Sequence, residues 1–128
     1  MRIFLFLLFC AALLLSCNNN KAFEQDRPES AIRGVFKAIQ SENFEKAAQF
    51  CTASSKKSLQ DFATNLKMVS SSEKENLLAP FSMQITKIDC KESLGSTHCD
   101  LCCSEFGDVS LEMVQQDNKW FVQIEFLY

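Results

Sequence analysis

The stretch 120–126, which reads WFVQIEF, decides the fold class of this chain. Apolar and polar side chains alternate along it, and its apolar face is formed by Trp120, Val122, Ile124 and Phe126. A period of two is typical of a β-strand with one buried face. The turn-forming residues 117–119 come directly before it. We therefore expect this stretch to be the last strand of an antiparallel sheet.

Three more strand candidates precede it, at residues 83–90, 98–106 and 109–115. The segments between them, 92–97 and 107–108, have the composition of turns. Connections this short allow only antiparallel pairing. The second half of the chain therefore predicts an antiparallel meander of about four strands.

The residues before Pro80 have helical periodicity instead. Pro28 suits the first position of a helix, where its missing N–H costs nothing. The apolar stripe that follows has helical spacing and consists of Ile32, Val35, Phe36 and Ile39. These residues predict a first helix with one buried face.

Polar breaks predict where the next helices begin. Ser41 or Asn43 can cap a second helix, and Ser54 or Ser55 a third. Their apolar faces are formed by Phe44, Ala47, Ala48 and Cys51 in the second and by Leu59, Phe62, Ala63 and Leu66 in the third. Ser72 and Glu75 have the spacing of a capping box, which favours a short further turn of helix.

Helices followed by strands predict an α+β fold, with the N-terminal helices packed on one face of a curved antiparallel sheet of about four strands. A cone of this kind can enclose one pocket. The side chains expected either to line the pocket or to fill the core are Phe36, Phe62, Trp120, Val122 and Ile124.

The N-terminus has the features of a secretory signal peptide. Residues 3–15 are an apolar run too short to span a bilayer, and Arg2 supplies a positive start. The run ends in Leu14-Leu15-Ser16-Cys17, which resembles the bacterial lipobox. The resemblance implies that Cys17 carries lipid and becomes the new N-terminus. An ordinary signal peptide, or a buried apolar helix, is the alternative.

This interpretation divides the chain into a signal peptide (1–16), a lipidated cysteine with a polar tether (17–27) and one domain (28–128). We expect a lipid-anchored protein of the bacterial cell envelope, on the outer membrane and facing the periplasm. The membrane, through the lipid, is then its first partner.

Composition excludes several classes of protein. The chain has 128 residues, of which 47% are hydrophobic, and a formal net charge of −3. That balance excludes a disordered tail and a collagen-like rod. Binding to nucleic acid needs clustered Lys and Arg, so it is not expected here.

The seven cysteines divide by position. Cys10 belongs to the signal peptide and Cys17 to the anchor, so the domain keeps Cys51, Cys90, Cys99, Cys102 and Cys103. A hairpin centred on residues 94–95 places Cys90 opposite Cys99, within reach of a disulfide. Cys51 can form a second bridge with Cys102 or Cys103 across the core.

The spacing Cys99-x-x-Cys102 also occurs in zinc sites and redox pairs. On a strand, however, residues three apart point to opposite faces. The structural disulfide is therefore the preferred interpretation of these cysteines, and we expect neither a metal nor a cofactor.

Short motifs resemble one known group of proteins. They are 28–30 (PES), 35–39 (VFKAI), 42–47 (ENFEKA) and 119–122 (KWFV). Together they resemble small bacterial lipoproteins of the nuclear-transport-factor-like superfamily, whose domains are cystatin-like cones. The resemblance implies the cone fold over about residues 28–126. Many such domains have no assigned activity.

Cone-fold enzymes use an Asp or His base and a Tyr or acid donor inside the pocket. The candidates here are His98, Tyr128, Asp89 and Asp100, and no spacing ties them into one site. We therefore expect a non-enzymatic binding or accessory module for an unknown small molecule or envelope protein. A small isomerase or hydratase using the pocket, or a protein–protein interaction module, is the alternative.

Overall fold

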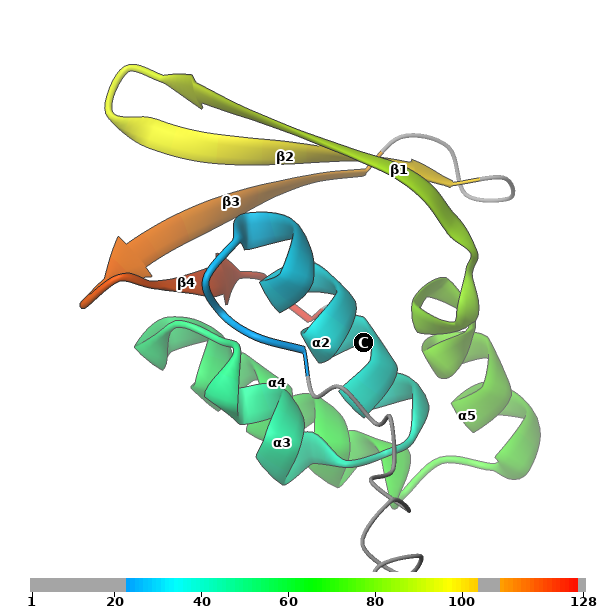
Figure 1. Cartoon of the computed structure of the whole chain (residues 1–128). Helices are drawn as coiled ribbons and strands as arrows, with labels where there is room; N and C mark the ends of the chain where they lie inside the picture. Colours follow the sequence, from blue (N-terminus) through cyan, green and yellow to red (C-terminus); the bar gives the residue numbers. More distant parts are fainter. Residues whose placement is uncertain (1–22, 104–108, 127–128) are drawn as a thin grey trace, which may run out of the picture.

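A layer of helices lies against one antiparallel sheet in the computed structural model, which describes residues 23–103 and 109–126 (Figure 1). The helical elements are α2 (Pro28–Gln40), α3 (Phe44–Gln49), α4 (Ala53–Leu66), α5 (Ser71–Leu78) and the 3-10 turn η1 (Ala79–Ser82). The strands are β1 (Ile85–Ser93), β2 (Ser96–Cys103), β3 (Val109–Gln116) and β4 (Lys119–Gln123). They pair in chain order β1-β2-β3-β4, each antiparallel to the next. The predicted α+β fold is confirmed.

Helix α2 forms the centre of the helical layer. It begins at Pro28, with Glu29 in its first turn, where a carboxylate is favoured by the positive end of the helix. The predicted stripe is buried, since Ile32, Val35 and Ile39 are fully covered. The helix periodicity of the sequence therefore located this element correctly.

The helix caps were predicted in part. The Asn43 side chain accepts a hydrogen bond from the Lys46 backbone N–H at 3.1 Å and caps α3, as expected. Helix α4 begins two or three residues earlier than predicted, because Thr52 takes the place expected for Ser54 or Ser55. Its Oγ1 donates to the Oγ of Ser55 at 2.9 Å, so these hydroxyls form one network.

The predicted capping box lies two residues upstream of its expected place. Ser70 and Glu73 form it, not Ser72 and Glu75, although both pairs have the same spacing. Ser70 has the extended backbone of a cap residue, whereas Ser72 already lies inside α5. In a run of serines, the Ser-to-Glu spacing does not by itself show which pair forms the capping box.

The β1–β2 hairpin has the register that the sequence predicted. Cys90 faces Cys99 and Ser93 faces Ser96, so only Leu94 and Gly95 form the turn. Both turn residues have positive φ (51° and 78°), as a type I′ hairpin turn requires. The loop was expected to span residues 92–97, so the two strands are longer than predicted. The tip of the hairpin projects beyond the helices (Figure 1).

Strand β4 ends earlier than the alternation of 120–126 predicted. It stops at Gln123, and the chain then leaves the sheet for α4. The Ile124 N–H donates to Ser55 Oγ at 2.8 Å, and the Phe126 N–H donates to Ser58 Oγ at 2.9 Å. Serine hydroxyls of α4 thus replace a neighbouring strand as acceptors, while Phe126 stays buried.

The outer edge of β4 is covered by backbone from the helical half. Cys51 forms a parallel bridge with Val122. The Val122 N–H donates to the Phe50 carbonyl at 2.7 Å, and the Thr52 N–H donates to the Val122 carbonyl at 3.1 Å. One edge of the sheet therefore has its hydrogen-bonding groups occupied.

Residues 23–27, which composition placed in the tether, pack on the domain. The Trp120 N–H donates to the Gln25 carbonyl at 2.8 Å. The Gln25 side chain in turn donates to the carbonyls of Gln49 and Trp120, each at 3.0 Å. Phe23 packs against the core, and the Lys37 ammonium lies 5.7 Å from the centre of its ring.

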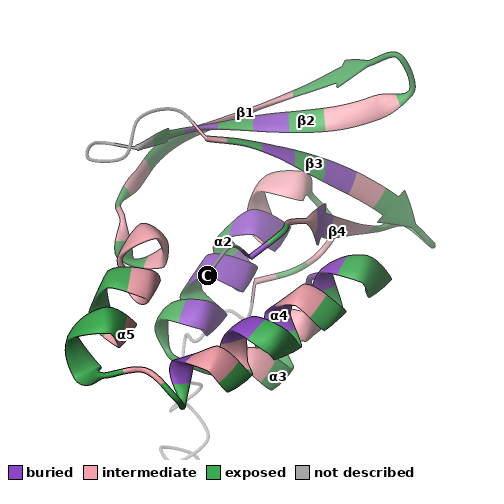
Figure 2. Cartoon of the chain, turned by 180° about the vertical axis from the view of Figure 1, so that it is seen from behind, coloured by how far each residue is buried: buried purple, intermediate pink, exposed green. Residues whose placement is uncertain are grey.

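Aromatic rings fill the space between the helices and the sheet. The Phe62 ring stacks on Phe126 with centroids 5.3 Å apart and meets the edges or tilted faces of Phe44 and Phe81. Phe36 meets Phe81 at 5.4 Å. Buried residues lie on α2, α4 and the middle of the sheet (Figure 2).

The expected pocket-or-core residues accordingly belong to this core. Phe36, Phe62 and Val122 are buried, and Trp120 and Ile124 are partly buried against the core. Their side chains pack in or against the core between the helices and the sheet.

Gly34 permits the close packing of α2 on the residue that follows α3. A Cβ at this position would lie 2.6 Å from ring atoms of the buried Phe50. We expect Gly34→Ala to destabilise the domain by about 1 kcal/mol, because overpacking costs more than the gain in helix propensity. Urea unfolding measures it, with Arg33→Ala as the exposed control. In a Phe50→Leu background the cost should shrink, and an undiminished cost would contradict this explanation.

Candidate functional site

The Cys90–Cys99 disulfide is the most distinctive chemical feature of the described residues. The two sulfurs are bonded across β1 and β2, as the hairpin register predicted, and the two Cα atoms are 4.0 Å apart. Cys99 is fully buried on the sheet face toward the helices. The bond therefore fastens the hairpin at its inner face.

The Cys99-x-x-Cys102 spacing does not form a site. Cys99 is spent in the disulfide, while Cys102 is exposed on β2, and strand parity directs the two to opposite faces. The side chain of Cys103 lies outside the described residues. Among residues 23–103 and 109–126, no group of three or more His, Cys, Asp or Glu is placed to hold a metal.

Cys51 is buried and carries a free thiol, so the structure does not join it to Cys102. Burial raises the pKa of the Cys51 thiol from 9.0 to about 12, partly offset by the charge of Lys56. A thiol held protonated in this way is a poor nucleophile, because the thiolate is the reactive form. Cys51 therefore contributes packing under β4 and no reactivity.

This pKa predicts how stability depends on alkaline pH. Above pH 9.0 the thiol ionises in the unfolded chain but stays protonated in the fold up to about pH 12, so the Cys51 contribution falls as pH rises across that window. The slope approaches about 1.4 kcal/mol per pH unit. Urea unfolding of wild type and Cys51→Ala should show their stability difference shrinking from about pH 8 to about pH 10. A constant difference would contradict the raised pKa.

The candidate acid–base groups lie on the exposed outer face of the sheet. Asp89 and Asp100 face each other across β1 and β2, next to the disulfide pair in register. The Asp89 carboxylate is 3.5 Å from Lys91 Nζ, and the exposed His98 ring lies 3.0 Å from Ser96 Oγ. Tyr128 lies outside the described residues. The structure therefore brings the two aspartates together, but away from the interior expected for a catalytic pocket.

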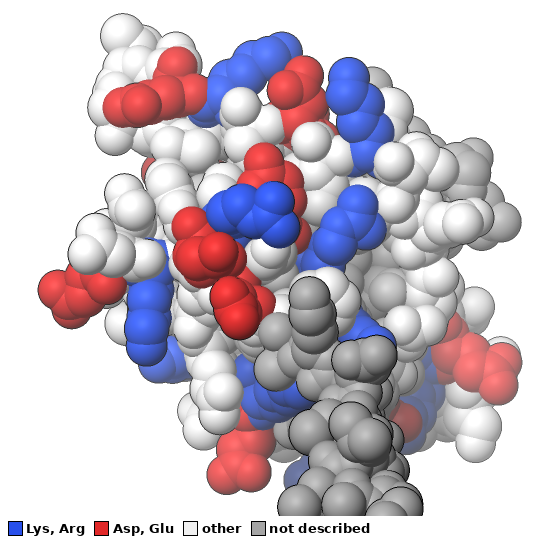
Figure 3. All heavy atoms as spheres, viewed as in Figure 1, with Lys and Arg blue, Asp and Glu red and all other residues white. Residues whose placement is uncertain are grey.

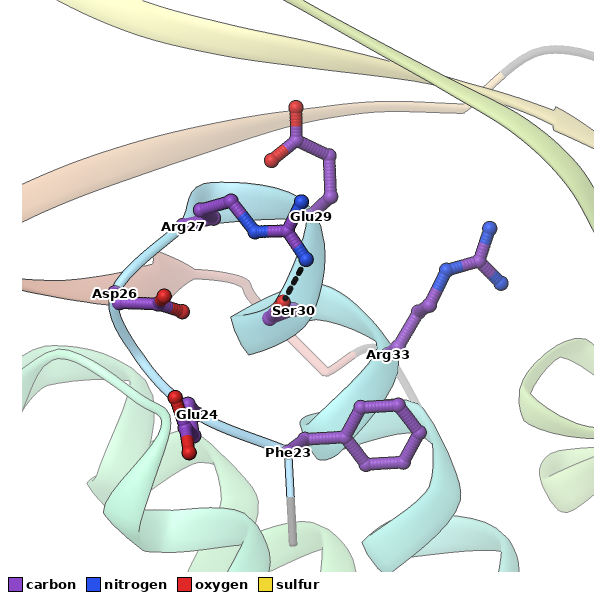
Figure 4. A pocket seen from close by; sticks show the side chains of 7 residues that line it. All are labelled: Phe23, Glu24, Asp26, Arg27, Glu29, Ser30 and Arg33. Atoms are coloured by element: carbon purple, nitrogen blue, oxygen red, sulfur yellow. Dashed lines mark hydrogen bonds between the residues drawn. The ribbon is translucent and has the colours of Figure 1, made fainter. Parts of the chain in front are cut away.

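A surface hollow of about 670 Å³ lies beside the start of α2 (Figure 4). It is lined by Phe23, Glu24, Asp26, Arg27, Glu29, Ser30 and Arg33. The Arg27 guanidinium bends back and donates to Ser30 Oγ at 3.4 Å. Three acidic and two basic side chains line the hollow, so charges of both signs are mixed there.

Charged side chains of both signs are interspersed over this side of the molecule (Figure 3). A continuous basic surface, which nucleic acid would need, is not seen on the described part of this face. No helix within the described ranges is long and apolar enough to cross a membrane. Cys17, the expected lipidation site, lies outside the described residues.

No protein-family model, curated protein or solved structure matches this chain. The fold itself is that of a small α+β domain, with helices followed by a four-stranded antiparallel sheet.

Sequence reasoning missed the residues that close one sheet edge. Gln25 and the carbonyl of Phe50 occupy the β4 edge, and Ser55 and Ser58 draw the C-terminal segment onto α4. Polar residues in a tether or on a helix give no local signal of such distant bonds. The only signal was the pair Ser55 and Ser58 at helical spacing, which places two hydroxyls on the same side of α4.

Proposed function

We propose that this chain is a lipid-anchored envelope protein whose single domain works as a non-enzymatic binding or accessory module. The observation that carries the non-enzymatic part is the filled interior, in which Phe62 contacts Phe44, Phe81 and Phe126. Enzymes of the cone type need polar groups inside a pocket. Here Asp89, Asp100 and His98 face outward, so we assign function to the surface of the domain.

The anchoring part rests on the N-terminal sequence, with the lipid on Cys17. Because Gln25 is hydrogen-bonded to Gln49 and Trp120, the free tether is shorter than residues 17–27. From Cys17 to Phe23 an extended chain reaches at most roughly 20 Å. An anchor at Cys17 would thus hold the domain close to the lipid surface.

The resemblance to nuclear-transport-factor-like lipoproteins is part of the same proposal. The helices-then-meander order supports it. On the short motifs that carry the resemblance, we propose that the domain is a curved cone of that superfamily.

Metabolic labelling tests the anchor. The full chain is expressed in a Gram-negative host fed an alkyne fatty acid, and the label is read on a gel after coupling to a dye. We expect label and membrane fractionation for the wild type, and loss of both for Cys17→Ala. Cys10→Ala is the matched control and should keep both. An unlabelled wild-type protein would overturn the anchoring part.

Binding of an apolar fluorescent probe tests the filled interior. N-phenyl-1-naphthylamine should show no saturable binding to the folded Cys17→Ala chain, because rings already occupy the space between helices and sheet. A Phe62→Leu variant should leave that result unchanged. Saturable one-to-one binding would instead indicate an open pocket and favour the isomerase or hydratase alternative.

A further inference from the structure

The two edges of the sheet differ in how they are covered. At β4, Phe50, Thr52 and Gln25 satisfy the outward backbone groups. At β1, no described strand or loop pairs with the outer edge. An uncovered edge of this length presents a row of donors and acceptors to another strand.

The register identifies which residues present these groups. Ser93 and Ser96 close the two-residue turn, so they form a hydrogen-bonded pair. Alternation then makes Cys90 and Cys99 a non-hydrogen-bonded pair, which agrees with their short Cα separation of 4.0 Å. The N–H and C=O groups of Ile88, Cys90 and Glu92 therefore point away from β2, toward the open edge.

The charged side chains of β1 favour one register over another when the β1 strands of two copies pair. Asp89 and Lys91 lie on the outer face, one residue to either side of Cys90. Antiparallel self-pairing centred on Cys90 sets each Asp89 opposite Lys91 of the other copy. Pairing centred on Asp89 would instead set Asp89 against Asp89 and Lys87 against Lys91. Opposite charges across strands stabilise and like charges destabilise.

Apolar side chains border the same edge. Met83, Ile85 and Ile88 are partly buried hydrophobic residues at the margin of the core. They lie on β1 and on the segment that leads into it from η1. A strand paired in register with Cys90 lies opposite Ile88 and covers it further, which adds an apolar contribution to the backbone bonds, whereas Ile85 and Met83 lie opposite the turn of that hairpin or beyond it.

We propose that two copies of this chain associate through antiparallel pairing of their β1 edges, centred on Cys90. Ile88 then exchanges backbone hydrogen bonds with Glu92 of the second copy, and Cys90 with Cys90. The two sheets become one continuous sheet about a two-fold axis. Because the β4 edge is already occupied, assembly stops at the dimer and does not continue into a fibre.

Proline substitution tests the edge itself. Glu92→Pro removes an outward N–H without removing a β1–β2 hydrogen bond, whereas Glu92→Ala keeps that N–H. The full chain is purified in detergent and its mass is measured by light scattering after subtraction of the detergent. The wild type and Glu92→Ala should be dimers, and Glu92→Pro a monomer with an unchanged circular dichroism spectrum. Full-chain Cys17→Ala should remain a dimer, which separates this proposal from the anchoring one.

Charge exchange tests the register. Asp89→Lys and Lys91→Asp each create like-charge pairs across the axis, so each variant alone should dimerise about tenfold more weakly or worse. Mixed together, or combined in one chain, they restore opposite charges and should recover the dimer. A monomeric wild type, or a dimer insensitive to these exchanges, would overturn the proposal. A monomer that instead takes up a strand from another protein would also overturn it.

Discussion

Replacing Phe62 by alanine is expected to lower the free energy of unfolding by about 3–5 kcal/mol. The Phe62 side chain is 2% exposed and contacts rings from α3, η1 and the C-terminal segment. Truncation would remove the ring that these elements share and leave a cavity, because the surrounding backbone relaxes only in part. For a domain of this size the loss is a large part of the total stability of roughly 5–15 kcal/mol.

Urea unfolding followed by circular dichroism measures this effect. Phe62→Leu keeps most of the apolar volume and should lose clearly less, which keeps the test informative if the alanine variant does not fold. Met68→Ala is the control, since Met68 is 75% exposed and should change stability by less than about 0.5 kcal/mol. A loss at Phe62 no larger than at Met68 would contradict its central place in the core.

Removing the disulfide should have the second largest effect. Cys90 and Cys99 are nine residues apart, and closing a loop of that length is expected to contribute about 2.5 kcal/mol by restricting the unfolded chain. We expect the double variant Cys90→Ala/Cys99→Ala to lose about that amount. Two alanines are used because a single change would leave an unpaired thiol, either at the buried Cys99 or at the partly buried Cys90.

Reduction supplies the matched measurement. Dithiothreitol should lower the stability of the wild type toward that of the double variant and leave the double variant unchanged. Cys102→Ala, at an exposed position of the same strand, should behave as the wild type. Equal stability of the oxidised wild type and the double variant would show that the bond does not stabilise this fold.

Much of the fold could be predicted because its signals are local. The stripe along α2 and the alternation of β4 reflect the periods of helix and strand. Leu94 and Gly95 at the centre of the hairpin predicted the Cys90–Cys99 register, since residues equally far from the centre of a symmetric hairpin face each other.

The errors occurred where several local solutions were equivalent. Ser70 and Ser72 offered the same capping-box spacing, and Thr52 competed with Ser54 and Ser55 for the cap of α4. Likewise, alternation continued to Phe126 although β4 ends at Gln123. At each place the outcome depended on a partner far along the chain or on the local backbone direction.

The candidate site was harder to predict than the fold. Asp89 and Asp100 were identified as acidic residues in strands, but only the register shows that they face each other on the outer side of the sheet. The coverage of one sheet edge by Gln25 and Phe50 had no local signal. The asymmetry of the two edges, on which the proposed dimer rests, is therefore a tertiary property.

The sequence by itself determined the class of fold, because the 2-residue and 3.6-residue periods are written along the chain. It also determined the Cys90–Cys99 pairing through the position of the hairpin turn. Only the tertiary structure decided that aromatic rings fill the space between the layers and that Cys51 stays a buried thiol. Both depend on how α4 and the C-terminal segment approach the sheet, and that approach is set by long-range packing and hydrogen bonds such as Phe126 to Ser58.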